Sequence, residues 1–188
     1  MVVTSLILRS VLSALDDGGH SVRVSRLVYA LSKEVGLDTN TSTLFSLASR
    51  YHDIGKLMLP KHILDSVEPL TEGERRVIQK HITYGLNVLT KYQGEEADVA
   101  RMIIATHHEH WDGNGYPKGL KAEEIPLCGR ITAICDVYDA LTSDRPYRSA
   151  WPPEMATAYI RERSGTQFDP NLVKPFLRVV MQPVGDGV

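Results

Sequence analysis

The chain has 188 residues, of which 43% are hydrophobic and 23% are charged, and it carries a formal net charge of -2 at pH 7. This length and apolar content predict one compact domain with a substantial core. The weak negative charge argues against a nucleic-acid polymer as partner, because duplex-binding domains are usually basic, but it permits a small anionic nucleotide. No apolar run approaches the ~20 residues that a membrane span needs.

Two cysteines, Cys128 and Cys135, are too few for a disulfide framework. Their separation fits two core positions of one helix, and free thiols are usually buried. The apolar stretch 2–15 is interrupted by Arg9 and has no basic segment before it, which disfavours a signal peptide. We therefore expect buried thiols in a reducing cytoplasm.

Apolar residues at helical spacing predict helices joined by short loops. The expected helices cover residues 2–15, 20–35, 41–51, 71 to about 81, 95–106, 126–143, a segment from 152, and a last one from 169. Prolines and glycines predict irregular segments over 55–69 and 112–119. Because period-2 alternation is nowhere sustained, the predicted fold class is all-α, a compact helical bundle with a metal site in its middle.

Three helix starts carry local signals. Thr71 and Glu74 have the spacing of a capping box, in which each side chain satisfies a free backbone amide. Pro153 is tolerated in a first turn, and Asp169 followed by Pro170 reads as an N-cap with proline at the first helical position. These signals place the beginnings of the three later helices.

Histidine and aspartate residues near the expected helix ends suggest chemistry. Seven are candidate metal ligands: His20, His52, Asp53, His81, His107, His108 and Asp136. Imidazole and carboxylate together suit Fe, Mn, Zn, Ni or Co. Neighbours on a helix point ~100° apart, so the two adjacent pairs among these residues favour more than one ion. A carboxylate can bridge, which makes Asp53 the natural bridge between two ions ~3.5–4 Å apart that clamp a phosphate and hold a hydroxide nucleophile.

Each candidate also has an ordinary interpretation as a surface or hydrogen-bonded core residue. We keep that interpretation for His62, in a loop, and for His110, at a rim. Asp136 lies among apolar residues of its predicted helix, so its carboxylate needs a partner. A metal ion would provide one, and an ion pair with an arginine such as Arg130 is the alternative.

Several motifs of the chain resemble the HD-GYP family, bacterial cyclic di-GMP phosphodiesterases within the HD metal-dependent phosphohydrolases. The motifs are HDIGK at 52–56, HHE at 107–109, DGNGYP at 112–117, DVYDALTSDRPYR at 136–148 and GTQFDP at 165–170. The Gly-Tyr-Pro loop separates this branch from other HD hydrolases. The resemblance covers about residues 16–180, so we expect a catalytic domain over 16–188 and, over 1–15, an N-terminal helix that is a linker remnant or a dimer contact.

The resemblance implies roles for individual residues. All seven candidates would be metal ligands with Asp53 bridging, and Lys56 would contact the scissile phosphate or the attacking hydroxide. Four further residues would bind substrate: Gly115, Tyr116, Arg145 and Arg148. Without the family context, the two arginines would be a solvated face and the tyrosine would pack on its own turn. Asp139, one helical turn from Asp136, would orient a ligand histidine.

The resemblance also implies a reaction and its cofactors. A metal-bridging hydroxide would hydrolyse cyclic di-GMP to the linear dinucleotide pGpG and, in many members, to GMP. The family most often uses iron or manganese, and nickel, cobalt, zinc and magnesium also fit. Members with three metals carry a Glu four residues before the first ligand His, where this chain has Asp16. Asp16 is either an extra ligand or the end of the first helix, and we expect two ions.

Three function classes follow. The first is a cyclic di-GMP phosphodiesterase, and the second is an HD-type hydrolase of another nucleotide. The third is a weakly active or non-catalytic module that binds a cyclic dinucleotide and docks a partner such as a cyclase domain. An upstream sensory domain and a second copy of the chain are further expected partners. The intact ligand set favours the enzyme, because a scaffold has no use for these ligands.

Overall fold

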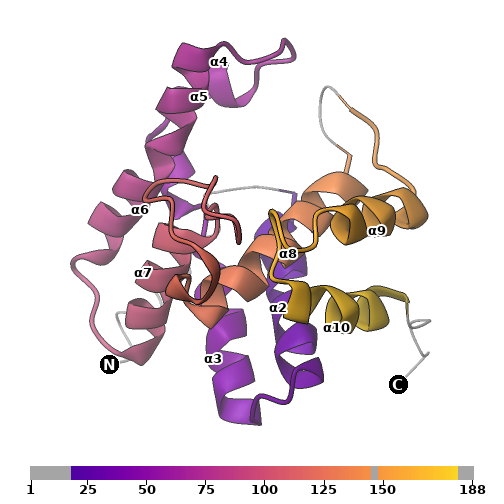
Figure 1. Ribbon diagram of the computed structural model, residues 1–188. Coiled ribbons are helices and arrows are strands. Elements are labelled where there is room, and N and C mark those ends of the chain that lie inside the picture. Colours follow the sequence, from indigo (N-terminus) through magenta and orange to yellow (C-terminus); the bar gives the residue numbers. More distant parts are fainter. Residues whose placement is uncertain (1–17, 145–147, 182–188) are drawn as a thin grey trace.

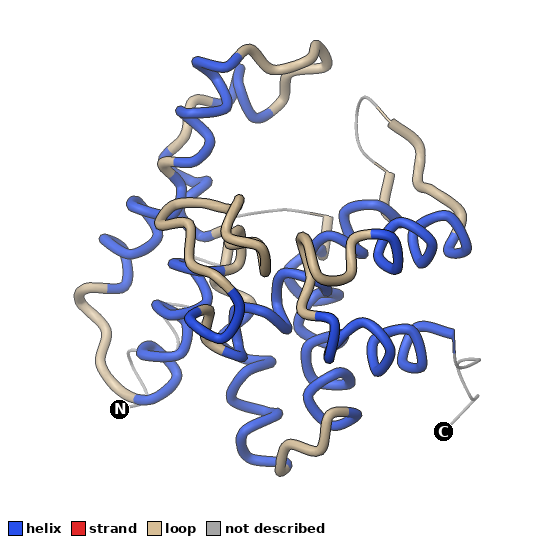
Figure 2. Tube along the Cα trace, in the orientation of Figure 1, coloured by secondary structure: helices blue, strands red, loops and turns tan. Residues whose placement is uncertain are grey.

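The computed structural model describes residues 18–144 and 148–181, and this part of the chain contains helices and no strand (Figure 2). The α-helices are α2 (His20–Glu34), α3 (Thr39–Ser49), α4 (Lys61–Leu64), α5 (Glu72–Gln79), α6 (His81–Leu89), α7 (Glu95–Thr106), α8 (Leu127–Thr142), α9 (Pro153–Glu162) and α10 (Pro170–Met181). Short 3₁₀ helices η1 (Ile54–Met58) and η2 (Ala122–Glu124) lie in the connections. The all-α prediction is confirmed. The expected helix over 2–15, Asp16 and Arg145 lie outside the described residues.

The predicted helix starts agree with the structure at the three positions where the sequence carries an identified signal, the beginnings of α5, α9 and α10. The Thr71 hydroxyl accepts from the amide of Glu74, and the Glu74 carboxylate accepts from the amide of Thr71, so the predicted capping box is present. The helix expected over 41–51 instead begins at Thr39, because the Asp38 carboxylate caps α3 by accepting from the amides of Asn40 and Thr41. The capping residues stabilise these ends because the first amides of a helix lack partners within it.

The segment 55–69 differs from the prediction, since it contains η1 and α4 rather than irregular chain alone. Pro60 precedes α4, where its missing amide costs nothing, and Ile63 turns inward and is buried. Elements of this length are too short to produce a helical period in the sequence. The short turns nevertheless keep the chain close to α6 directly after Asp53.

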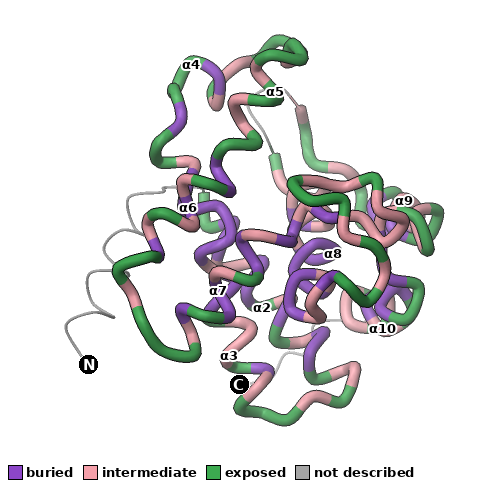
Figure 3. Tube along the Cα trace, turned by 60° about the vertical axis from the view of Figure 1, so that its left-hand side comes forward, coloured by how far each residue is buried: buried purple, intermediate pink, exposed green. Residues whose placement is uncertain are grey.

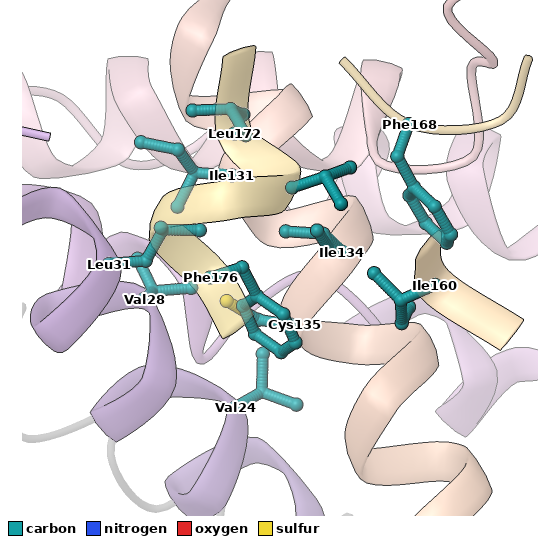
Figure 4. Close-up of a cluster of buried hydrophobic side chains, with 11 residues drawn as sticks. Val24, Val28, Leu31, Ile131, Ile134, Cys135, Ile160, Phe168, Leu172 and Phe176 are labelled. Carbon is teal, nitrogen blue, oxygen red and sulfur yellow. The ribbon is translucent and has the colours of Figure 1, made fainter. Parts of the chain in front are cut away.

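Two apolar cores hold the helices together, and α8 contributes to both. The first, which we call the α7 core, consists of Ala48, Tyr51, Ile54, Ile82, Leu89, Val99, Ala100, Ile103, Ile104 and Cys128. The second, the α10 core, consists of Val24, Val28, Leu31, Ile131, Ile134, Cys135, Ile160, Phe168, Leu172, Val173 and Phe176 (Figure 4). Both cysteines are buried and unpaired, as predicted. The buried parts of α2, α6, α7 and α8 lie together in the middle of the molecule (Figure 3).

The α4–α5 region projects from the body of the molecule (Figure 1). We call residues 61–79 the arm, and its second helix, α5, has no buried residue. No helix in the described ranges is long and apolar enough to cross a membrane.

Candidate metal centre

The seven predicted ligands come from well-separated parts of the sequence and meet at the centre of the bundle. His20 begins α2, His81 begins α6, and Asp136 lies on α8. The two adjacent pairs, residues 52–53 and 107–108, lie in the turns that follow α3 and α7. Every predicted ligand except Asp136 therefore lies at or just beyond a helix end, where the backbone can direct neighbouring side chains to a common point.

A close backbone contact brings Asp53 next to α6. A Cβ atom on Gly55 would lie 1.9 Å from the carbonyl oxygen of His81 and 2.5 Å from the amide nitrogen of Gly85. Glycine is therefore required at position 55, because only a residue without a side chain lets η1 pass this close to the helix. The contact places the carboxylate of Asp53 beside the first residue of α6.

The ligand atoms form two groups that adjoin each other. The first group comprises Asp53, His81, His107 and His108, and the second comprises His20, His52 and Asp136, with ligand atoms within 4.8 Å of one another in each group. Nε2 of His52 lies 3.3 Å from Oδ2 of Asp53 and 3.6 Å from Oδ1 of Asp136, so His52 faces both groups. The structure thus brings all seven predicted ligands together.

Hydrogen bonds from the far side of the rings orient most of these histidines. Nδ1 of His52 lies 2.8 Å from the carbonyl oxygen of Ser49, and Nδ1 of His81 lies 2.7 Å from that of Ile78. Nδ1 of His107 lies 3.0 Å from the carbonyl oxygen of Ile103. Each of these contacts directs Nε2 of the ring into the site, which is how metal-binding histidines are usually held.

His20 is held by a carboxylate instead. Its Nδ1 lies 2.6 Å from Oδ2 of Asp139, the residue expected to orient a ligand histidine, and its Nε2 lies 3.0 Å from Oδ1 of Asp136. Arg23 donates to both oxygens of Asp139 at 2.7 and 3.0 Å. The prediction missed Arg23, although it follows His20 by one helical turn and could have been found from that spacing.

Four buried polar atoms of the site have no hydrogen-bond partner in the described part of the chain. They are Nε2 of His52, Nε2 of His81, Nε2 of His107 and Oδ1 of Asp53. An unsatisfied buried polar atom is costly, so such atoms are rare and call for an explanation. Here they converge on one region and combine imidazole with carboxylate, so these residues fit a site for divalent cations.

The electrostatics of the site differ between the two groups. Burial lowers the pKa of His108 to about 4 and holds the pKa of His107 well below its usual range, so both rings are neutral, as metal binding requires. Burial also disfavours charge on His52, but the carboxylates of Asp53 and Asp136 outweigh it and raise the pKa of His52 to about 10. Without a metal ion, the negative charges of Asp53 and Asp136 therefore favour a proton on His52, at the place where a bound cation would offset the same charges.

Comparison with known proteins agrees with this geometry. The model of a family described as "HD domain" matches residues 4–172. The chain belongs to the HD domain family. The resemblance to its HD-GYP branch is also confirmed, because curated relatives are named as cyclic di-GMP phosphodiesterases.

The relatives of this HD domain are longer proteins. It is 38% identical over 162 residues to "3′3′-cGAMP-specific phosphodiesterase 2" of Vibrio cholerae, covering 86% of this chain and 31% of the relative. It is 39% identical over 165 residues to "Cyclic di-GMP phosphodiesterase response regulator RpfG" of Xanthomonas campestris pv. campestris, covering 86% and 44%. A solved HDG"Y"P protein from Bdellovibrio bacteriovorus shares the fold, with a TM-score of 0.67, 21% identity, and coverage of 86% of this chain and 51% of that one. The chain thus spans less than half the length of these curated relatives.

The ion pair of Asp136 with Arg130, the alternative to a metal, does not form, and no arginine of the described residues pairs with Asp136. Nη1 of Arg130 lies 2.5 Å from Oδ2 of Asp169, at the start of α10, and the guanidinium also lies over the ring of Trp111. Asp136 instead faces His20 and His52. His62 and His110 belong to neither ligand group.

The predicted substrate-binding residues that the structure describes are not equally close to the ligand groups: Lys56 and Tyr116 contact members of these groups, whereas Arg148 contacts the end of α8. Lys56 pairs through Nζ with Oδ2 of Asp53 and is partly exposed. The ring of Tyr116 stacks on His108. A Cβ on Gly115 would lie 2.2 Å from the amide nitrogen of His110, so this position requires a glycine for the loop to pack. Arg148 donates from Nη2 to the carbonyl oxygen of Ala140 at 2.5 Å, at the C-terminal end of α8.

Proposed function

We propose that this HD domain is a metal-dependent phosphodiesterase that hydrolyses a cyclic dinucleotide, with cyclic di-GMP as the first candidate. The observation that carries this proposal is the pair of adjoining ligand groups with His52 between them. Two adjacent cation sites suit the clamping of a phosphodiester. The names of the relatives, which include phosphodiesterases of cyclic di-GMP and of 3′3′-cGAMP, support the substrate class.

Two divalent ions, iron or manganese by preference, would supply Lewis-acid chemistry at the phosphodiester when bound. Asp53, His81, His107 and His108 would hold one ion, and His20, His52 and Asp136 would hold the other. The buried carboxylate of Asp53 belongs to the first group and faces His52 of the second, which supports its role as the bridging ligand.

Lys56 is the residue that we propose to bind the scissile phosphate. Its ammonium group pairs with the carboxylate of Asp53, and its side chain is 31% exposed, so it can reach a ligand at the surface of the site. A cation beside the phosphate would stabilise charge that develops on the phosphoryl oxygens.

Arg145 and Arg148 are proposed to bind a phosphate or a guanine base. Nη2 of Arg148 is used by the carbonyl oxygens of Ala140 and Leu141, while its Nε and Nη1 make no hydrogen bond to the described residues. Those free donors could bind an anion bidentately or in part, since a guanidinium has five N–H groups in a fixed fork.

The linear dinucleotide pGpG is the proposed product, with GMP as the product of a second step. Asp16 would be needed for that step if it holds a third ion. We also propose a cytoplasmic location, because the chain holds two buried, unpaired thiols.

Hydrolysis of 3′3′-cGAMP is the second candidate function. The specific observation in its favour is the 38% identity to the Vibrio cholerae phosphodiesterase named for that compound. The two substrates differ in one purine, so the difference would lie in the contacts to the bases and not in the ligand groups.

The test is anaerobic incubation of the purified chain with Fe(II) or Mn(II) and each cyclic dinucleotide in turn. Products are separated by chromatography, and metal is counted per chain. Conversion of cyclic di-GMP to pGpG with two ions bound is the expected result. Preferential conversion of 3′3′-cGAMP would replace the first candidate by the second. Bound metal without conversion of either compound would contradict the hydrolase and leave a binding and docking module.

A further inference from the structure

One ligand histidine is not oriented by a hydrogen bond. The rings of His20, His52, His81 and His107 are all held at Nδ1, whereas the ring of His108 makes no hydrogen bond to the described part of the chain. The His108 ring stacks on Tyr116 instead, with centroids 4.8 Å apart and planes inclined by 21°. Its other ring neighbours, His81 and His107, are themselves ligands. Tyr116 is therefore the contact that can fix this ring from outside the ligand set.

Tyr116 is held firmly enough to serve this purpose. Its amide donates to the carbonyl oxygen of His108 at 3.1 Å, and its ring packs against the α7 core. The phenolic hydroxyl makes no hydrogen bond to the described residues, so stacking of the Tyr116 ring is its side chain's contact with the His108 ring. Stacked aromatic pairs contribute beyond the area that they bury, and they restrict the orientation of both rings.

Glu109 holds the loop that carries this tyrosine. Its side chain is buried, with the residue 2% exposed, and its two carboxylate oxygens accept from the amides of Lys118 at 2.8 Å and Leu120 at 3.0 Å. Glu109 forms no ion pair within the described residues, so these two amides are the hydrogen-bond partners of its carboxyl oxygens. A buried carboxylate in this position joins the returning limb of the loop to the segment that bears His107 and His108.

We propose that Glu109 and Tyr116 are positioning residues of the metal centre. Glu109 closes the loop, the closed loop holds the ring of Tyr116 against His108, and this contact aims the imidazole at the cation bound by the Asp53 group. The inference rests on the proposed metal centre, but it does not depend on which dinucleotide is the substrate.

The first test compares Tyr116→Ala with Tyr116→Phe by calorimetric titration of the full chain with Mn(II), together with metal counting. The alanine variant should lower the affinity of the chain for one of the two ions by about tenfold or more, as loss of an orienting contact usually does. The phenylalanine variant keeps the ring and should bind both ions as the unaltered chain does. Lys118→Ala is the matched control in the same loop, because it keeps the backbone amide that Glu109 binds.

The second test asks whether Glu109 acts through Tyr116. Glu109→Gln replaces one acceptor oxygen with an amide donor that faces a backbone amide. It should therefore lower the affinity for the same ion by about tenfold. In the Tyr116→Ala background the same change should have little further effect, because the two residues act in series. Circular dichroism of each variant establishes that the helices are retained.

Two results would overturn the inference: wild-type affinity for both ions in Tyr116→Ala, or an equal loss on Glu109→Gln in both backgrounds. These measurements use metal alone. Binding of two ions by the unaltered chain without hydrolysis of any cyclic dinucleotide would therefore contradict the proposed function while the inference stands.

Discussion

Replacing Gly55 by alanine would test how the backbone places Asp53 beside α6. The new Cβ would lie 1.9 Å from the carbonyl oxygen of His81, whereas real contacts of this kind do not fall below 3.0 Å, so the two segments would have to separate by about 1 Å. The neighbouring atoms belong to backbone and cannot turn away. We expect a loss of about 3 kcal/mol in the free energy of unfolding, at the upper end of the usual range for overpacking.

Gly73→Ala is the matched control for this substitution. Position 73 lies in the exposed helix α5, where the nearest atom to an added Cβ is the Thr71 hydroxyl oxygen at 4.0 Å. The same change should therefore stabilise the protein by ~0.5 kcal/mol, because it reduces the freedom of the unfolded chain.

Urea unfolding of the metal-free variants, followed by circular dichroism, measures both effects. Mn(II) counting then shows whether the Gly55→Ala variant also loses affinity for cations, as expected if Asp53 moves with η1. Equal midpoints for the two alanine variants would refute the reasoning, since they would show that the backbone contact at Gly55 can relax without cost.

Three further predictions concern the site and the thiols. Asp53→Ala should lower the metal content and abolish hydrolysis while helicity stays near native; full turnover would refute the two-ion centre. Arg145→Ala should weaken substrate binding, measured as a raised KM, and leave the metal content unchanged; a loss of metal would show that its role is misassigned. Burial raises the pKa of Cys128 to about 11 and that of Cys135 well above its ordinary value, so both thiols should resist a disulfide reagent at pH 8 until urea is added, and prompt labelling of the folded protein would contradict this burial.

The sequence was sufficient to predict the helices that have strong periodicity or an identified start signal, and it was sufficient to predict which seven side chains meet at the centre of the bundle. Thr71 and Glu74 determine a helix start through bonds between neighbours in the chain, so that start can be predicted without knowledge of the fold. Their meeting could be predicted because adjacent His and Asp residues at helix ends, together with the motifs, are informative even before their positions in space are known; their role as ligands stays a prediction.

Contacts between distant segments could not be predicted in this way. The partner of Arg130 proved to be Asp169 and not Asp136, because the residue that directly precedes α10 offers its carboxylate to this arginine of α8. The stacking of Tyr116 on His108 likewise depends on how a loop folds back on itself. Neither contact has a fixed spacing in sequence, so local rules cannot find it.

The hydrogen bond between His81 and Ile78 connects the projecting arm directly to a residue of the candidate metal centre. Ile78 lies in the last turn of α5, and its carbonyl oxygen lies 2.7 Å from Nδ1 of His81. Because α5 buries no residue, its persistence depends on local bonds such as the capping box, and such segments open most readily. Each opening of that last turn would break the hydrogen bond that orients the His81 ring. The helical stability of the exposed arm would thereby affect the geometry of the buried site.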